Sequence, residues 1–329
     1  MDTVAGRPSA DSVATTSGAL REDGAASAKL EAERTFLFGL CYRMTGTASD
    51  AEDVVQETFV RALEKPPRDV ESALRPWLVR VAMNLSRDLL RRRKRRSYHG
   101  IWLPTPLETP DVELDLVPST DDSPEARYGL LESASFAFLV ALEELTPAQR
   151  AVLLLRDVFD HSSREAADAL GVTEENVRIT LHRARAKMAA YDGDRRQSAN
   201  LTEELVGMLG RMMMCIMARD AVGARALLAP GARCLTDGGG KFHAAPKAVV
   251  GAERITKLYL GLSRNASPEA KVSVRTVNGR PALVGEDADA KRPNAPRFVL
   301  LVDLDREGKI RSLFSVIAPD KLDRVRFPT

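Results

Sequence analysis

Residues 163–188 read Ser-Arg-Glu-Ala-Ala-Asp-Ala-Leu-Gly-Val-Thr-Glu-Glu-Asn-Val-Arg-Ile-Thr-Leu-His-Arg-Ala-Arg-Ala-Lys-Met. The stretch begins as a short helix that Gly171 ends, because glycine adopts the left-handed conformation of a helix C-terminus without strain. Thr173 has a side chain suited to cap a second helix. A helix, a short glycine-containing turn and a second helix form the pattern of a helix-turn-helix, which predicts DNA binding.

The second of these helices has two distinct sides. Apolar residues at helical spacing predict its buried side: Val177, Leu181, Ala184 and Met188. On the opposite side, arginine and histidine can contact base edges or phosphates, and an apolar side chain can meet a thymine methyl group. The candidate DNA-binding residues are Glu175, Arg178, Ile179, His182, Arg183 and Arg185. Single helix-turn-helix patterns often arise by chance, so this interpretation depends on a second basic element upstream.

Residues 76–96 supply that second element. A helix is predicted to begin at Pro76, because proline suits a first helical turn. Its polar stripe runs into six consecutive basic residues, Arg91 to Arg96, which repel one another unless a polyanion is near. An asparagine among arginines can also read a base edge. The candidate residues are Arg80, Asn84, Arg87, Asp88, Arg91 and Arg92.

An acidic helix precedes this basic one. Ser49 and Glu52 have the spacing of a capping box, so a helix is predicted to start with Ser49 as its cap. Acidic side chains in a first turn suit the helix dipole. Ordinary capping and a docking surface for a basic partner are therefore alternatives for this segment.

Composition indicates a multidomain protein. The chain has 329 residues, of which 44% are hydrophobic and 29% are charged, and this length predicts two or three soluble globular domains. The net charge of +2 means that nucleic-acid affinity has to come from local patches. No apolar run is long enough to span a membrane, and no secretory signal is predicted. Three widely spaced cysteines fit a reducing compartment, so we expect a cytoplasmic protein.

The C-terminal part of the chain changes from helical to strand patterns. Residues 202–228 are predicted to be helical, Asn278-Gly279 indicates a hairpin turn, and Phe298, Leu300, Val302 and Leu304 alternate along a predicted strand. Asp237 and His243 are candidates for an acid–base pair, but their spacing is loose and no further carboxylate or histidine clusters with them. We therefore expect neither an enzyme nor a cofactor or metal site.

Residues 28–190 resemble the sigma-70 family RNA polymerase sigma factors of the extracytoplasmic-function type (ECF, group IV). They contain three motifs that are similar to motifs of that family and occur in the same order. Residues 50–59 are similar to that family's polymerase-binding segment, residues 75–88 to its promoter-melting and −10 helix, and residues 164–185 to its −35 helix-turn-helix. The resemblance implies promoter DNA and the beta and beta-prime subunits of core RNA polymerase as partners. The polymerase-binding residues that it implies are Asp50, Glu52, Asp53, Gln56 and Glu57.

Three further segments resemble one subgroup, the SigJ type, which carries a fused SnoaL-like domain of the NTF2-like fold. They are a linker that contains Trp102, a glycine-rich motif at 237–241 and a terminal motif at 319–322, before which Ala318 replaces the usual asparagine. The resemblance implies that this domain regulates the factor in place of a separate anti-sigma protein. The regulatory residues implied are Trp102, Asp237, Gly238, Gly239, Gly240, Lys241, Asp320 and Lys321.

The expected architecture is two all-α domains followed by an α+β domain. The expected ranges are a disordered tail at 1–27, sigma region 2 at 28–96, an acidic proline-rich linker at 97–125, sigma region 4 at 126–191 and a SnoaL-like domain at 198–329. One alternative is a stand-alone helix-turn-helix regulator with a ligand-sensing NTF2-like domain, and another is an NTF2-like enzyme tethered to DNA. The sequence leaves open whether the third domain binds a small molecule.

Overall fold

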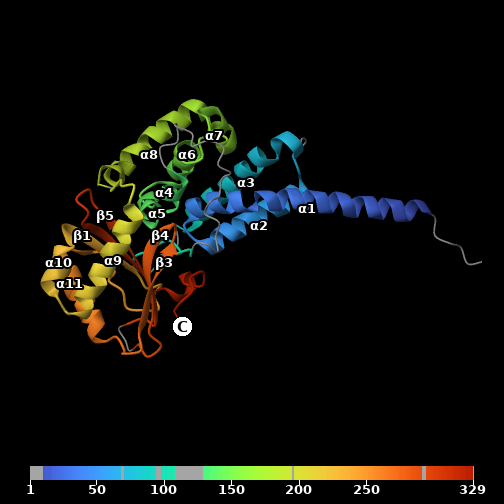
Figure 1. The fold of residues 1–329 in the computed structure, drawn as a ribbon. Coiled ribbons are helices and arrows are strands. Elements are labelled where there is room, and N and C mark those ends of the chain that lie inside the picture. The colour runs from blue at the N-terminus through green and yellow to red at the C-terminus, as the bar shows by residue number, and fades with distance from the viewer. Residues whose placement is uncertain are drawn as a thin grey trace, which may run out of the picture.

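The computed structural model describes residues 10–67, 70–93, 98, 100–108, 129–194, 196–290 and 294–328, which form three parts (Figure 1). The first part consists of α1 (Ala10–Thr45), α2 (Ala48–Glu64) and α3 (Val70–Arg93). The second part consists of α4 (Leu130–Ala134), α5 (Phe136–Leu142), α6 (Pro147–Asp157), α7 (Ser163–Leu170) and α8 (Glu174–Asp194).

The third part is a sheet with helices. Its helices are α9 (Leu201–Met217), α10 (Ala221–Ala226) and α11 (Ala252–Arg264), followed near the C-terminus by a 3-10 turn (Pro319–Lys321). Its strands are β1 (Leu228–Asp237), β2 (Val249–Val250), β3 (Lys271–Val277), β4 (Arg280–Glu286), β5 (Arg297–Leu304) and β6 (Ile310–Val316).

Three helix starts differ from the sequence expectation. The α1 helix begins at Ala10, inside the segment expected to be a disordered tail, and residues 1–9 lie outside the described residues. Thr47, not Ser49, caps α2, because its hydroxyl accepts a 3.2 Å hydrogen bond from the Asp50 amide. The α3 helix begins at Val70 and contains Pro76 in its interior, where the flanking Leu74 and Trp77 both pack on the core.

The first two parts share one hydrophobic core, although the sequence predicted two separate helical domains. Leu37 of α1, Leu78 of α3 and Leu153 of α6 are all fully buried in it. Buried arginines reinforce this contact. The Arg43 Nε donates to the Ser133 hydroxyl at 2.8 Å, and Arg150 donates to the Met44 carbonyl at 2.9 Å. The helical parts therefore form a single packed body in this arrangement.

The sheet has the strand order β2-β1-β6-β5-β4-β3, with β1 and β6 parallel and the other neighbours antiparallel. The predicted hairpin is confirmed: Asn278 and Gly279 join β3 to β4 with φ angles of 53° and 69°. The β3 strand lies at the edge of the sheet, and its Val272 and Val274 are exposed. Apolar residues that alternate along an edge strand can therefore lie at the surface.

Both faces of the sheet centre are covered. Helix α9 packs on one face, where Leu300, Val302 and Leu304 lie as the alternation of β5 predicted. The opposite face packs on Phe136 of α5 and on Leu103 of the linker, and it buries Val299 and Leu301 as well. The described part of the linker, residues 101–108, is thus an extended segment buried between the parts of the protein, whereas residues 109–128 lie outside the described residues.

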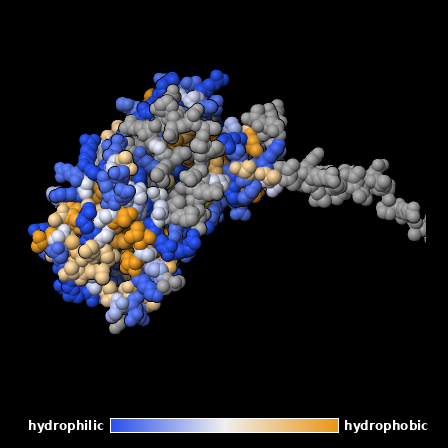
Figure 2. All heavy atoms as spheres, viewed as in Figure 1, coloured by the Kyte–Doolittle hydropathy of each residue, from blue (hydrophilic) through white to orange (hydrophobic). Residues whose placement is uncertain are grey.

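The helices of the third part leave apolar side chains at the surface. Met208 and Met212 of α9 are buried, but Met217 is 75% exposed and Met214 is 71% exposed. In the space-filling view, apolar residues gather over the same part of the molecule (Figure 2). Among the described residues, no helix is long and apolar enough to cross a membrane.

Candidate polymerase, promoter and regulatory sites

The acidic side of α2 is at the surface because Ala51, Val54, Val55, Thr58 and Phe59 occupy the buried side. Glu52, Asp53, Gln56 and Glu57 are exposed and Asp50 is half-buried. A cavity of about 390 Å³ separates this acidic side from the end of α3, with Asp53 and Glu57 on one wall and Arg92 and Arg93 on the other. The sequence-predicted polymerase residues therefore form one surface beside a groove.

The C-terminal tail reaches this acidic surface. Arg324 forms an ion pair with Glu52, and both side chains are about half exposed. Because an exposed ion pair contributes little stability, this contact on its own does not fix the tail. It does place a positive charge where the sequence predicted a basic partner.

On α3, the candidate −10 residues Arg80, Asn84, Asp88, Arg91 and Arg92 are exposed. Arg87 differs from them, because its guanidinium donates a 3.2 Å hydrogen bond to the carbonyl of Leu170, the last residue of α7. Burial lowers the pKa of Arg87. The first helix of the helix-turn-helix thus covers part of the predicted −10 surface. Residues 94–96 of the basic run lie outside the described residues.

The helix-turn-helix has the predicted caps and the predicted buried side. Gly171 has a φ angle of 66°, and the Thr173 hydroxyl accepts a 3.2 Å hydrogen bond from the Asn176 amide. Val177 and Leu181 are among the buried residues. The exposed side of α8 carries the candidate −35 residues Glu175, Arg178, Ile179, His182 and Arg183.

Arg185 does not belong to that exposed side. Its guanidinium makes two hydrogen bonds, of 2.6 and 2.9 Å, to the carboxylate of Asp157 on α6. The Asp157 side chain is only 1% exposed. This ion pair joins α8 to α6, and the helical spacing that suggested DNA contact did not reveal the partner.

Asp237 is fully buried at the end of β1, and its carboxylate accepts four hydrogen bonds. The donors are the Tyr98 hydroxyl at 2.6 Å, the Leu103 amide at 2.8 Å, the Gly239 amide at 2.9 Å and the Lys321 ammonium at 2.7 Å. Two of these donors belong to the linker and one belongs to the C-terminal turn. Asp237 therefore joins three segments that are far apart in the sequence.

Lys321 and Trp102 extend this junction to α3. Burial lowers the pKa of Lys321, and the Asp237 carboxylate opposes that shift. The Lys321 ammonium lies 4.4 Å from the centre of the Trp102 ring, and the Arg93 guanidinium lies 4.1 Å from it, both within cation–π range. A Cβ atom at Gly46 would approach this ring to 2.6 Å, so only glycine fits there. Asp237, Lys321, Trp102 and Arg93 are called the latch below.

The remaining members of the regulatory motifs lie beside the latch. Lys241 and Asp320 form an exposed ion pair that ties the glycine-rich turn to the terminal turn. A Cβ atom at Gly239 would lie 2.9 Å from the Cβ of Ala318, so the position that departs from the subgroup pattern is in direct contact with the glycine-rich turn.

The geometry gives no support to acid–base catalysis at Asp237. All its hydrogen bonds go to structural partners, and His243 is exposed with no contact to it among the described residues. Within the same described residues, no cluster of three or more His, Cys, Asp or Glu side chains is arranged to hold a metal ion.

Sequence reasoning missed two buried polar residues at the same interface. Asn278 was recognised only as a turn residue, but its side chain bonds to the linker and to both helical parts. Glu108 is 3% exposed and accepts a 2.6 Å hydrogen bond from the Arg326 amide. The Asn-Gly pair was a signal for the first residue, whereas nothing local distinguishes Glu108 from the other acids of the linker.

Two family models match the helical parts. Residues 30–96 match the model of sigma-70 region 2, and residues 135–188 match the model of sigma-70 region 4. Together with the helix-turn-helix and the exposed acidic and basic helices, these matches define a transcription initiation factor, not an enzyme.

The whole chain resembles particular sigma factors. The ECF RNA polymerase sigma factor SigJ of Mycobacterium tuberculosis is 34% identical over 306 residues, which cover 89% of this chain and 92% of that protein. SigG of the same organism is 38% identical over 213 residues, which cover 59% and 56% of the two chains. The crystal structure of Mycobacterium tuberculosis SigJ matches with a TM-score of 0.70 and 28% identity, over 92% of this chain and 100% of that chain.

The chain therefore belongs to the ECF RNA polymerase sigma factors. Sigma factors bind core RNA polymerase and promoter DNA. The match to SigJ extends through the third part, so the predicted fold class, two sigma regions followed by a SnoaL-like domain, is confirmed. These likenesses support the sigma factor and not the alternative of a stand-alone regulator.

Proposed function

We propose that this sigma factor is held in a closed state by its own C-terminal domain, acts in the cytoplasm and needs no separate anti-sigma protein. The observation that carries the proposal is the latch, in which a buried carboxylate and a buried ammonium join the linker, the C-terminal turn and α3. The Asp237 carboxylate accepts hydrogen bonds from the linker and from the C-terminal turn together, so this set of contacts forms only when those segments are packed on β1.

Core polymerase docks on the acidic surface of α2 in this proposal. Asp50, Glu52, Asp53, Gln56 and Glu57 would face a basic partner on the beta or beta-prime subunit. Their exposure supports the assignment, as does the groove that separates them from α3. The Arg324–Glu52 pair occupies one edge of this surface in the closed state.

Promoter DNA contacts two helices in this proposal. The −35 element is read by Glu175, Arg178, Ile179, His182 and Arg183 on the exposed side of α8. The −10 region is opened and held by Arg80, Asn84, Arg87, Asp88, Arg91 and Arg92 on α3. The bond from Arg87 to Leu170 supports a closed state that has to open first, because it holds α7 against part of the proposed −10 surface.

The domain ranges follow the same proposal. Residues 28–96 act as sigma region 2, residues 126–191 as sigma region 4 and residues 198–329 as the SnoaL-like regulatory domain. The burial of residues 103–108 supports a linker that serves the closed state.

Transcription assays with purified core polymerase and a promoter library test the proposal. A chain that ends after residue 318 and a Lys321→Met variant should both change transcript yield strongly while the helical body stays folded by circular dichroism. Lys247→Met is the matched control, because Lys247 is an exposed lysine of the same domain that lies outside the latch and the regulatory motifs. Wild-type transcription by both the truncated chain and Lys321→Met would refute control by the latch.

A further inference from the structure

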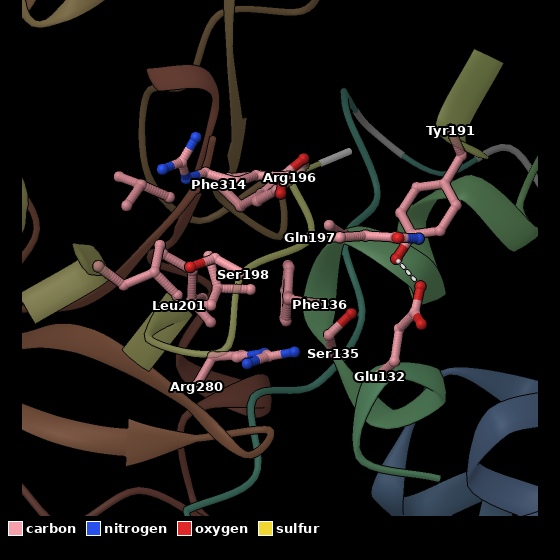
Figure 3. Close-up of a pocket in the computed structure, with 15 residues that line it drawn as sticks. Glu132, Ser135, Phe136, Tyr191, Arg196, Gln197, Ser198, Leu201, Arg280 and Phe314 are labelled. Atoms are coloured by element: carbon pink, nitrogen blue, oxygen red, sulfur yellow. Dashed lines mark hydrogen bonds between the residues drawn. The ribbon is translucent and has the colours of Figure 1, made fainter. Parts of the chain in front are cut away.

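A cavity lies where the helix-turn-helix part meets the sheet of the C-terminal domain (Figure 3). It has a volume of about 230 Å³. One wall is formed by Ser135 and Phe136 at the start of α5 and by Tyr191 of α8, and the other by Arg280 of β4 and by strands β5 and β6. Because its walls come from both parts, the cavity exists only while those parts are packed together.

The charged side chains that line this cavity differ in their partners. Arg196 is paired with Glu204, Asp303 accepts a 2.6 Å hydrogen bond from Arg311, and Glu132 accepts a 3.2 Å hydrogen bond from the Tyr191 hydroxyl. The side chain of Arg280 forms no hydrogen bond or ion pair with any described residue. In Figure 3 its guanidinium extends from β4 into the space between the sheet and α5.

The environment of Arg280 favours the binding of an anion. Burial lowers its pKa, and the nearby Tyr191 and Asp303 only partly offset this effect. A guanidinium stays protonated and presents a planar fork of donors that matches a carboxylate or a phosphate. Since Asp303 is already held by Arg311, a ligand anion would supply the hydrogen bonds that Arg280 lacks.

Apolar side chains form about half of the cavity lining, beside the polar ones. The Phe136 and Phe314 rings are 5.6 Å apart at its floor, and Leu201, Leu205 and Leu301 complete the lining. Ligand sites for larger molecules are typically about 300–1,000 Å³, so this cavity suits a ligand about the size of an aromatic acid. Bare phosphate would leave the apolar floor unfilled.

We propose that this cavity binds a small organic carboxylate, whose carboxylate pairs with Arg280 and whose apolar body packs against Phe136 and Phe314. The binding itself does not depend on the function proposed above, but its consequence rests on it. A ligand that binds only the packed arrangement stabilises that arrangement in proportion to its occupancy. The bound acid therefore strengthens the closed state of the sigma factor.

Titration calorimetry on the full chain tests the binding with benzoate as the probe. Benzamide is the uncharged control ligand, because it keeps the ring and loses the negative charge. Benzoate should bind the wild type at least about tenfold more tightly than benzamide does, since only benzoate forms the charge-assisted pair. Arg280→Gln should lose this preference. Arg254→Gln, an exposed arginine on α11 outside the cavity, should keep it.

Two further measurements keep the test decisive. Arg280→Lys retains the charge without the fork, so an intermediate affinity is expected even if the glutamine variant folds poorly. Benzoate should also slow hydrogen exchange in residues 130–142 and 280–304 of the wild type. Absence of benzoate binding at about 10 mM, a concentration that detects even very weak complexes, would overturn the proposal.

Equal affinity for benzoate and benzamide, or equal benzoate affinity in wild type and Arg280→Gln, would also overturn the proposal. Binding of inorganic phosphate as tight as that of benzoate would refute the role of the apolar floor. None of these readouts uses polymerase, so their failure is distinguishable from failure of the latch. If benzoate binds but leaves transcription by wild type unchanged, the regulatory consequence is wrong while the site stands.

Discussion

The side-chain amide of Asn278 donates a 2.7 Å hydrogen bond to the hydroxyl of Tyr42, although 236 positions separate the two residues in the sequence. The same amide donates to the carbonyl of Ala134 at 3.0 Å. Asn278 also exchanges two hydrogen bonds with the backbone of Leu107, and Tyr42 donates in turn to Thr105. One buried hairpin residue therefore connects the linker, both helical parts and the C-terminal sheet.

Replacing Asn278 by alanine should destabilise the closed arrangement by about 2–4 kcal/mol, since several buried groups each lose a hydrogen bond. Asn278→Gly separates this loss from backbone strain, because glycine tolerates the φ angle of 53° and still lacks the amide. We expect both variants to unfold at lower urea concentration and to lose hydrogen-exchange protection at Leu107. A glycine variant as stable as the wild type would contradict this role.

Arg178→Ala and Arg183→Ala should each weaken binding to the −35 element by about 1–3 kcal/mol, the usual scale for one lost base-specific contact. Fluorescence anisotropy with promoter DNA measures this loss, and thermal unfolding should be unchanged because both side chains are exposed.

Arg185→Ala is the structural counterpart on the same helix. It leaves the buried Asp157 without its ion-pair partner, so it should lower the unfolding temperature.

If Arg178 and Arg183 were dispensable for promoter affinity, the proposed reading side of α8 would be wrong.

Asp53→Arg should abolish binding to core polymerase, because a reversed charge meets a basic partner with like charge and costs several kcal/mol at an interface. Glu64→Arg is the matched control, since Glu64 is also exposed on α2 but lies at its far end. Co-purification with polymerase measures the binding. Equal recovery of the Asp53 variant and the wild type would place the docking surface elsewhere.

The three cysteines should differ in their reaction with a thiol reagent at about pH 8, where an ordinary cysteine is partly ionised. Burial raises the pKa of Cys41 to about 12 and also raises the pKa of Cys234, so both should stay protonated and unreactive. Cys215 is half-buried and should react first. Mass mapping of the labelled peptides checks the order, and rapid labelling of Cys41 in the native protein would contradict the packed core.

Local spacing was sufficient where each signal lies within a few turns of chain. The cap at Thr173, the left-handed Gly171 and the Asn278–Gly279 hairpin all occur in the structure as predicted. Such signals are reliable because capping and turn formation depend on neighbouring backbone groups. The helix-turn-helix and the order of the three sigma-like motifs could be predicted from the sequence for the same reason.

Local sequence patterns did not predict burial or pairing where these depend on residues that are distant in the sequence. Val272 and Val274 alternate like buried strand residues, but β3 is an edge strand with no layer over that face. Arg185 has the spacing of a DNA-contacting residue, but Asp157 on another helix holds it. In each case the deciding neighbour lies outside the window in which periodicity is measured.

The sequence by itself determined the class of protein, the helix-turn-helix, and the exposed acidic and basic helices, because periodicity, capping and local charge depend on residues that are neighbours in the sequence. Only the tertiary structure decided that Asp237, Lys321, Trp102 and Arg93 meet, and that Arg280 faces a cavity. The physical reason is that these side chains come from segments that are far apart in the sequence, so no local pattern predicts which of them meet when the chain packs.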